Sequence, residues 1–127
     1  MGKKLGSGAF GEVFLAKDVK TGEEVALKVE SNRTRHPQIL HEAKLLKVLK
    51  GKGIPELKGV IIEGDYNIMV MQLLGPSLED LFGYCKKRFS LKTVLMISIQ
   101  CVSFLLFLVG ENRAHSILQL FAQRHQT

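Results

Sequence analysis

A glycine-rich segment near the start of the chain has the pattern of a phosphate-binding loop. Residues 6–11 read Gly-Ser-Gly-Ala-Phe-Gly, with glycine at the first, third and sixth positions. Glycine lets a backbone approach a phosphate closely and adopt φ values that other residues avoid. Val13 follows the last glycine by two residues, and Lys28 supplies a cation one predicted strand later. The combination predicts a nucleotide phosphate site, and a glycine-rich hairpin without a ligand is the simpler alternative.

The residues after this loop separate two classes of nucleotide-binding protein. In a dinucleotide-binding fold, a helix follows the glycine-rich turn and holds the pyrophosphate at its N-terminus. Here residues 12–17 and 25–29 alternate apolar and polar side chains, and a Lys-Thr-Gly turn lies between them. The context therefore excludes a dinucleotide-binding fold and predicts strands joined by a hairpin.

A change of period after the second strand predicts a helix over residues 37–50. Pro37 suits the first turn of a helix, and a Gly-Lys-Gly stretch ends the pattern. Glu42 shares the apolar face of this helix with Leu46, four residues later. Because a carboxylate on such a face is costly to bury without a cation, we predict an ion pair between Glu42 and Lys28. An exposed strand lysine and a solvated helix glutamate are the alternative.

Strands and two capped helices follow in the second half of the chain. Residues 57–62 and 67–73 flank a Glu-Gly-Asp turn and predict a second hairpin. Ser77 and Ser90 have the position and side chain of N-caps, and Asp80 stands where a capping box places its acidic residue.

Composition and charge bound the class of protein. The chain has 127 residues, of which 46% are apolar and 24% charged, as in one folded domain of ordinary size. The net charge is +6, but the positive residues are scattered, so we expect no nucleic-acid partner. Cys85 and Cys101 fit neither a disulfide framework nor a metal site. Early charged residues argue against a signal peptide, so we expect a cytoplasmic location, with the nucleus as the alternative.

The last predicted helix is unusually apolar. Thr93 to Gly110 contains no charged residue, and a transmembrane helix needs about 20 apolar residues. Ser98, Gln100 and Ser103 lower its hydropathy. We therefore expect a buried helix of a larger domain, and a small membrane-anchored protein is the alternative.

The glycine-rich loop and the strand after it resemble the protein kinases. Val13 completes the pattern G-x-G-x-x-G-x-V, and Val25-Ala26-Leu27-Lys28 matches the V-A-I-K form of that family. In protein kinases this lysine contacts the α- and β-phosphates of ATP, and a glutamate on the next helix holds it in place. The resemblance implies these roles for Lys28 and Glu42.

Further segments resemble the casein kinase 1 family of Ser/Thr protein kinases. They are residues 63–71, 73–82 and 89–95, together with the His-Pro-Gln before the first helix. The resemblance covers residues 2 to about 101 and implies an α+β fold. Residues 1–74 would form a kinase N-lobe, a five-stranded antiparallel sheet with one helix, and residues 75–101 the first helices of an incomplete helical C-lobe. The implied function is ATP-dependent phosphorylation of protein Ser/Thr with Mg²⁺, with proteins as substrates.

The same resemblance assigns the adenine site. Met71 is the implied gatekeeper, and the backbone carbonyl of Gln72 and N–H of Leu74 receive the edge of the base. Gln72 departs from the glutamate usual in the family, but only its backbone is needed. The complete set of implied nucleotide-binding residues is Leu5, Gly6, Ser7, Gly8, Ala9, Phe10, Gly11, Val13, Ala26, Lys28, Glu42, Met71, Gln72 and Leu74.

The motifs that carry catalysis in this family are absent from the sequence. Kinases need the Asp of an H-R-D loop as catalytic base and the Asp of D-F-G as a metal ligand. No aspartate follows Asp80 in this chain. We therefore assign no catalytic and no metal-binding residue and expect the chain to be inactive. A non-catalytic fragment that binds partners is the alternative function.

Residues 102–127 depart from the family pattern. With synonymous codons chosen for residues 121–127, a one-base frame shift spells Leu-His-Arg-Asp-Ile-Lys-Pro, the catalytic loop. Codons for Val102 to Leu108, with the first base of the Val109 codon, can begin like a splice donor and end like an acceptor. We therefore predict a non-family tail that derives from a short retained intron and a shifted frame. A natural tail from alternative splicing is the alternative.

Overall fold

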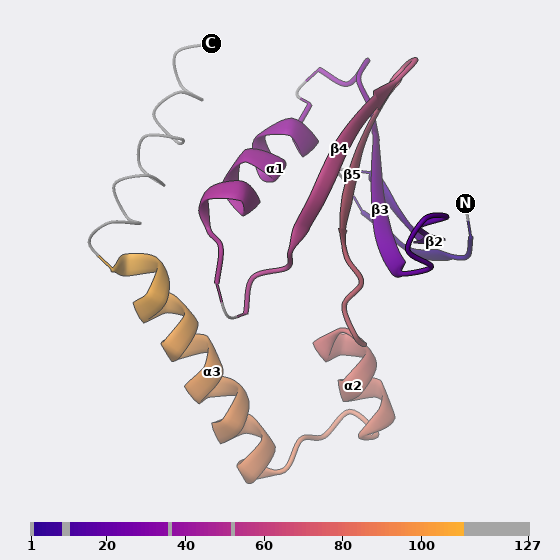
Figure 1. Cartoon of the computed structure of the whole chain (residues 1–127). Helices are drawn as coiled ribbons and strands as arrows, with labels where there is room; N and C mark the ends of the chain where they lie inside the picture. Colours follow the sequence, from indigo (N-terminus) through magenta and orange to yellow (C-terminus); the bar gives the residue numbers. More distant parts are fainter. Residues whose placement is uncertain (1, 9–10, 36, 52, 111–127) are drawn as a thin grey trace. The chain divides into compact units, whose positions relative to one another are not determined.

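The computed structural model describes residues 2–8, 11–35, 37–51 and 53–110 (Figure 1). Ala9, Phe10 and most of the predicted tail therefore lie outside the described residues. The chain divides into two compact units, residues 1–74 and 75–127. Each unit is described by itself.

The first unit contains a five-stranded antiparallel sheet, which confirms the predicted sheet. The strands are β1 (Lys4–Gly8), β2 (Gly11–Lys17), β3 (Glu24–Ser31), β4 (Leu57–Glu63) and β5 (Tyr66–Gln72). Their order in the sheet is β1-β2-β3-β5-β4 (Figure 1). Each pair of neighbouring strands is antiparallel. The ends of β4 and β5 lie within one residue of the predicted ends, because alternation and turn residues fix both hairpins locally.

Helix α1 (Ile39–Val48) packs on this sheet, and the hydrophobic core of the first unit lies between the helix and the sheet. Ile39 and Ala43 on the helix are buried with Met69 on β5. Partly buried Leu46, Leu57 and Met71 pack around this cluster. The apolar face predicted for this helix is therefore its buried face.

The start of α1 differs from the prediction. Gln38 is the N-cap residue, so Pro37 lies one residue before the cap and outside the first turn. The side chain of Gln38 makes no capping hydrogen bond, so the orphan N–H groups of this helix need another acceptor.

The second unit begins with two capped helices. Ser77 caps α2 (Leu78–Tyr84): its hydroxyl accepts from the Asp80 N–H, while the Asp80 carboxylate accepts from the Ser77 N–H. Ser90 caps α3 (Leu91–Val109) by accepting from the Thr93 N–H. All three capping residues are those predicted, because a cap depends on neighbours three residues away.

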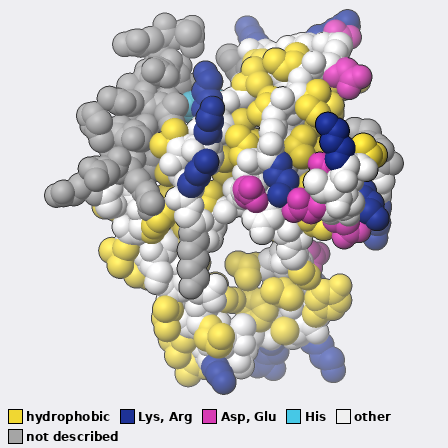
Figure 2. Space-filling model, in the orientation of Figure 1, with side chains coloured by type: hydrophobic (Ala, Val, Ile, Leu, Met, Phe, Trp, Pro, Cys, Tyr) yellow, Lys and Arg dark blue, Asp and Glu magenta, His cyan; other side chains and the backbone are white. Residues whose placement is uncertain are grey.

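Helix α3 exposes its apolar side chains. None of its residues is buried by the described part of the chain, and Figure 2 shows hydrophobic side chains at the surface in this region. The helix is long and apolar enough to cross a membrane. Core helices of larger soluble domains meet the same two criteria, so length and composition alone leave both interpretations of α3 in place.

Candidate nucleotide-binding site

The glycine-rich segment forms a hairpin between β1 and β2. Gly6 pairs with Val13, Ser7 with Glu12, and Gly8 with Gly11. The tip of this hairpin, residues 9 and 10, lies outside the described residues. The strand that follows the loop is β2, which agrees with a kinase-type glycine loop and leaves no helix where a dinucleotide-binding fold would have one.

The glycines of this hairpin differ in what the chain requires of them. Gly11 has φ of +128°, and a Cβ there would collide with the carbonyl oxygen of Val29 on β3. Only glycine therefore fits at position 11. At Gly6 and Gly8, a Cβ would meet no heavy atom within 4 Å. The packing of the described chain does not demand glycine at those two positions, and their backbone is open to a ligand.

Cross-strand pairing gathers four of the implied site residues on one face of the sheet. Val13 on β2 pairs with Lys28 on β3, and Ala26 on β3 pairs with Met71 on β5. Directly paired residues share a face, and so do residues two apart on one strand. Val13, Ala26, Lys28 and Met71 therefore line the same face, on which α1 also packs.

Lys28 and Glu42 form an ion pair between the sheet and α1. The Lys28 Nζ donates to Oε2 of Glu42 at 2.6 Å. The two side chains are 21% and 39% exposed, so the pair is screened in part by solvent. This contact confirms the predicted pairing, while the role of Lys28 toward phosphate stays a prediction. The pair holds a lysine head group beside the face that carries Val13 and Ala26.

Glu30 is a positioning residue of this site that the sequence analysis missed. Its side chain is buried, with 4% of the residue exposed. Its carboxylate accepts from the N–H of Gln38 at 2.9 and 3.0 Å and from the N–H of Ile39 at 3.1 Å. Glu30 thus accepts the hydrogen bonds that the side chain of the N-cap residue does not accept. Its negative charge also interacts favourably with the positive N-terminal end of the helix dipole.

A signal for this role was present in the sequence. Glu30 lies two residues after Lys28 and therefore on the same face of the strand. The helix that follows begins without a Ser, Thr, Asp or Asn at its cap position. An acid on the core face of a strand, next to an uncapped helix, indicates capping from a distance.

The residues implied for the adenine edge lie at and beyond the end of β5. Met71 is half-buried against the core beneath α1. The Gln72 N–H donates to the Glu56 carbonyl at 2.9 Å, and its side-chain oxygen accepts from the Glu56 N–H at 3.2 Å. Leu74 is exposed, and its backbone N–H makes no hydrogen bond with the described residues. Gln72 thus anchors the segment through both backbone and side chain.

Among the implied nucleotide-binding residues on the described strands, Leu5 is the one whose place is least fixed by strand pairing. Lys4 pairs with Phe14 and Gly6 with Val13, so Leu5 is an extra residue opposite this step of β2. Its side chain is exposed. The bulge removes the alternation that would assign Leu5 to one face of the sheet.

The described residues offer no cluster of side chains that could hold a metal ion by themselves. Residues 2–8, 11–35, 37–51 and 53–110 contain no group of three or more His, Cys, Asp or Glu side chains placed to hold a metal ion. Magnesium is usually held by one or two carboxylates together with waters and the phosphates of the nucleotide, and the D-F-G aspartate that supplies such a carboxylate in kinases does not occur in this sequence. No step is therefore assigned to a metal held by these residues.

A comparison with known protein families completes this description. The family model described as "Protein tyrosine and serine/threonine kinase" matches residues 1–120. The match spans most of the chain and runs beyond residue 101, where the motif resemblance ends. Protein kinases typically use ATP with Mg²⁺ and act on protein substrates. Because the family model matches far more than half of the chain, this chain belongs to the protein tyrosine and serine/threonine kinase family.

Proposed function

We propose that this chain forms the ATP-binding part of a Ser/Thr protein kinase of the casein kinase 1 type. The observation that carries the proposal is the Lys28–Glu42 ion pair, 2.6 Å long, on the sheet face that also bears Val13. The open backbone at Gly6 and Gly8 supports it, because the described chain gives no packing reason for glycine there.

Each residue has a distinct task in this proposal. The backbone of Gly6 and Gly8 approaches the phosphates, since no side chain stands between. Lys28, held by Glu42, neutralises phosphate charge in a fixed position. Val13 and Ala26 offer apolar surface to the base. Glu30 acts indirectly, because it anchors the helix that carries Glu42.

The proposal assigns nucleotide binding without phosphoryl transfer to the 127-residue chain. Transfer needs the catalytic aspartate and the metal ligands as well as positioned phosphates. Neither an H-R-D nor a D-F-G sequence occurs in the chain. We therefore expect no kinase activity above background on casein, and transfer that disappears in Lys28→Ala would contradict this expectation.

Nucleotide binding can be tested by NMR. We expect weak binding, with Kd of the order of 1 mM, or about −4 kcal/mol, because the C-lobe supplies much of the adenine site in this family. Titration of ATP into the labelled chain should shift amide signals at Gly6, Gly8, Val13 and Lys28. Lys28→Ala should abolish these shifts, whereas Lys20→Ala, an exposed turn lysine, should preserve them. Shifts confined to other regions would overturn the proposed site.

The subfamily can be tested with a fusion protein. Residues 2–101 would replace the corresponding part of a casein kinase 1 catalytic domain, which supplies the missing catalytic loop. We expect ATP-dependent phosphorylation of casein that Lys28→Met abolishes. A fusion that folds and binds ATP but phosphorylates only tyrosine would contradict the Ser/Thr assignment and leave the nucleotide site intact.

A further inference from the structure

Two hydrogen bonds join Gln72, the last residue of β5, to Glu56, the residue before β4. The Gln72 N–H donates to the Glu56 carbonyl at 2.9 Å. In the other direction, the Glu56 N–H donates to the side-chain Oε1 of Gln72 at 3.2 Å. In a regular antiparallel ladder, two residues that face each other in this way exchange both bonds through their backbones. Here the side chain of Gln72 replaces its own backbone carbonyl in the second bond.

This replacement leaves the Gln72 carbonyl without the donor that a regular ladder would supply. Among the described residues, no N–H of a loop or turn donates to this carbonyl. Gln72 also pairs with Val25 on β3, but its N–H points to Glu56 and therefore away from β3. Because the N–H and C=O of one strand residue point to the same side, the carbonyl does not join the ladder with β3 either. Within the described chain, β5 thus ends in an unused backbone acceptor.

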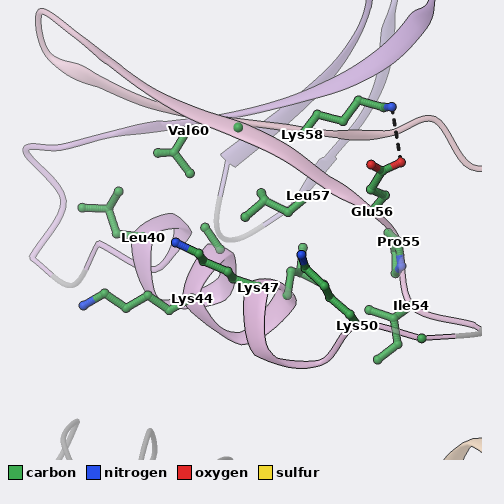
Figure 3. A pocket seen from close by; sticks show the side chains of 14 residues that line it. Leu40, Lys44, Lys47, Lys50, Ile54, Pro55, Glu56, Leu57, Lys58 and Val60 are labelled. Atoms are coloured by element: carbon green, nitrogen blue, oxygen red, sulfur yellow. Dashed lines mark hydrogen bonds and ion pairs between the residues drawn. The ribbon is translucent and has the colours of Figure 1, made fainter.

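Glu56 is held from a second direction as well. Its carboxylate pairs with the Lys58 Nζ at 3.4 Å, as Figure 3 shows. Lys58 also pairs with Glu23, just before β3, at 2.9 Å. The side chain of Glu56 is 69% exposed, so its ion pair contributes little free energy. The two hydrogen bonds with Gln72 are therefore the main anchor of this segment.

We propose that the side chain of Gln72 is a specificity-determining group of the adenine site, because it keeps the Gln72 carbonyl free for the exocyclic amino group of the base. This inference rests on the proposed function. An amino group donates and a ring nitrogen accepts, so one edge of adenine matches a free carbonyl and the unbonded N–H of Leu74, two residues later. A purine without the amino group leaves the carbonyl unsatisfied and binds less tightly.

A purely structural role of Gln72 leads to a different expectation. If the side chain only tied β5 to Glu56, its removal would weaken every nucleoside alike. If it keeps the carbonyl free, its removal lets the Glu56 N–H turn to that carbonyl. Only a ligand that donates to the carbonyl then loses affinity.

The test is an NMR titration of the labelled full chain with adenosine and with purine riboside, the same nucleoside without the amino group. In the unaltered chain, adenosine should bind at least about threefold more tightly and shift the amide signal of Leu74. Gln72→Met keeps the length of the side chain but lacks the acceptor. It should weaken adenosine by about threefold and leave purine riboside unchanged.

Two further variants serve as rescue and control. Gln72→Glu keeps an acceptor oxygen and should retain the preference for adenosine. Asn32→Ala is the matched control, because it removes another exposed hydrogen bond between a side chain and a distant backbone group, from the Asn32 Nδ2 to the Gly64 carbonyl at 3.0 Å. This control should bind both nucleosides like the unaltered chain. The amide spectrum of each variant shows whether the fold is retained.

A measurement on the unaltered chain does not depend on any variant. Hydrogen exchange at the Glu56 N–H should be the same with and without saturating adenosine, because this N–H is bound to a side chain and does not compete with the base. An exchange rate that rises when adenosine is added would show that base and N–H share the carbonyl, and the proposal would be wrong.

The remaining outcomes separate this proposal from the proposed function. Equal weakening of both nucleosides by Gln72→Met would reduce Gln72 to a structural anchor. Unchanged binding of both nucleosides in that variant would leave the adenine site in place and remove the role of this side chain. A Leu74 signal that neither nucleoside shifts in the unaltered chain would instead overturn the adenine site of the proposed function, and this inference with it.

Discussion

Lys28 and Glu30 leave β3 on the same face, two residues apart, and both bind α1. Lys28 reaches the side chain of Glu42, and Glu30 reaches the backbone N–H groups of Gln38 and Ile39. One strand thus fixes the first turn of the helix at two points. The orientation of the Lys28 head group therefore depends on a helix that Glu30 holds in place.

Removal of the Glu30 carboxylate should destabilise the first unit. We expect Glu30→Ala to lower the free energy of unfolding by about 1–3 kcal/mol, because the N–H groups of Gln38 and Ile39 lose their acceptor. Glu30→Gln keeps one acceptor oxygen and should recover part of the loss. Urea denaturation measures both. Glu24→Ala, at the exposed start of the same strand, is the control, and a Glu30→Ala protein as stable as this control would refute the capping role.

The Lys28–Glu42 pair should show measurable energetic coupling. A double-mutant cycle with Lys28→Met and Glu42→Gln should give about 0.5–1 kcal/mol, because the pair is partly shielded from solvent. The pair between Lys4 and Glu12 is the internal comparison. Its side chains are more exposed, at 45% and 51%, so its coupling should be smaller. Equal coupling in both cycles would mean that the burial of Lys28 adds nothing to the contact.

The capping box of α2 should respond to acid. The Ser77 hydroxyl and N–H donate to the Asp80 carboxylate at 2.7 and 2.9 Å and hold the pKa of that carboxyl below its ordinary value of 3.8. Since the folded pKa is the lower one, this stabilisation is complete above about pH 4 and is lost as the pH falls through the lowered pKa. A carbon-13 NMR titration should find this depressed pKa. Ser77→Ala removes the hydroxyl and keeps the backbone N–H, so it should raise this pKa part of the way toward 3.8, and an unchanged pKa in that variant would exclude the Ser77 hydroxyl as a cause.

The exposed apolar surface of α3 should drive association. Such a surface promotes aggregation or capture by chaperones when nothing covers it. We expect the full chain to aggregate on expression and a truncation after Gly83, which removes α3, to be more soluble. Size-exclusion chromatography compares the two proteins. A full chain that floats with added lipid vesicles, while the truncation does not, would favour the membrane-anchored alternative.

The tail should differ between genomic DNA and spliced transcript. If the codons for Val102 to Leu108 and the first base of the Val109 codon are an intron, the spliced message lacks them and continues into the family's catalytic loop. Reverse-transcription PCR across Gln100 to Thr127 shows whether they are removed. A single product that retains the segment, with codons that spell no H-R-D in any frame, would end this hypothesis.

Local pattern determined most of what was predictable in this fold. Alternation placed the strands, and short-range partners fixed Ser77 and Ser90 as caps. The Lys28–Glu42 pair was predictable because an acid on the apolar face of a helix is costly to bury without a cation. Pro37 was placed too far into α1, because the helix begins where Glu30 can reach its N–H groups. The residue at which α1 begins therefore depends on the packing of a strand against a helix, which no local sequence pattern indicates.

The glycine pattern mixes two kinds of constraint that should separate during evolution. Gly11 is fixed by its positive φ and by the Val29 carbonyl, so its loss would harm folding in any descendant. Gly6 and Gly8 meet no such obstacle, so only a bound ligand would keep selecting for them. In a lineage that abandoned nucleotide binding, the first two glycines would drift while the third remained. A relative that has lost Gly6 and Gly8 but kept Gly11 would therefore be recognised from its sequence as one that no longer binds the nucleotide.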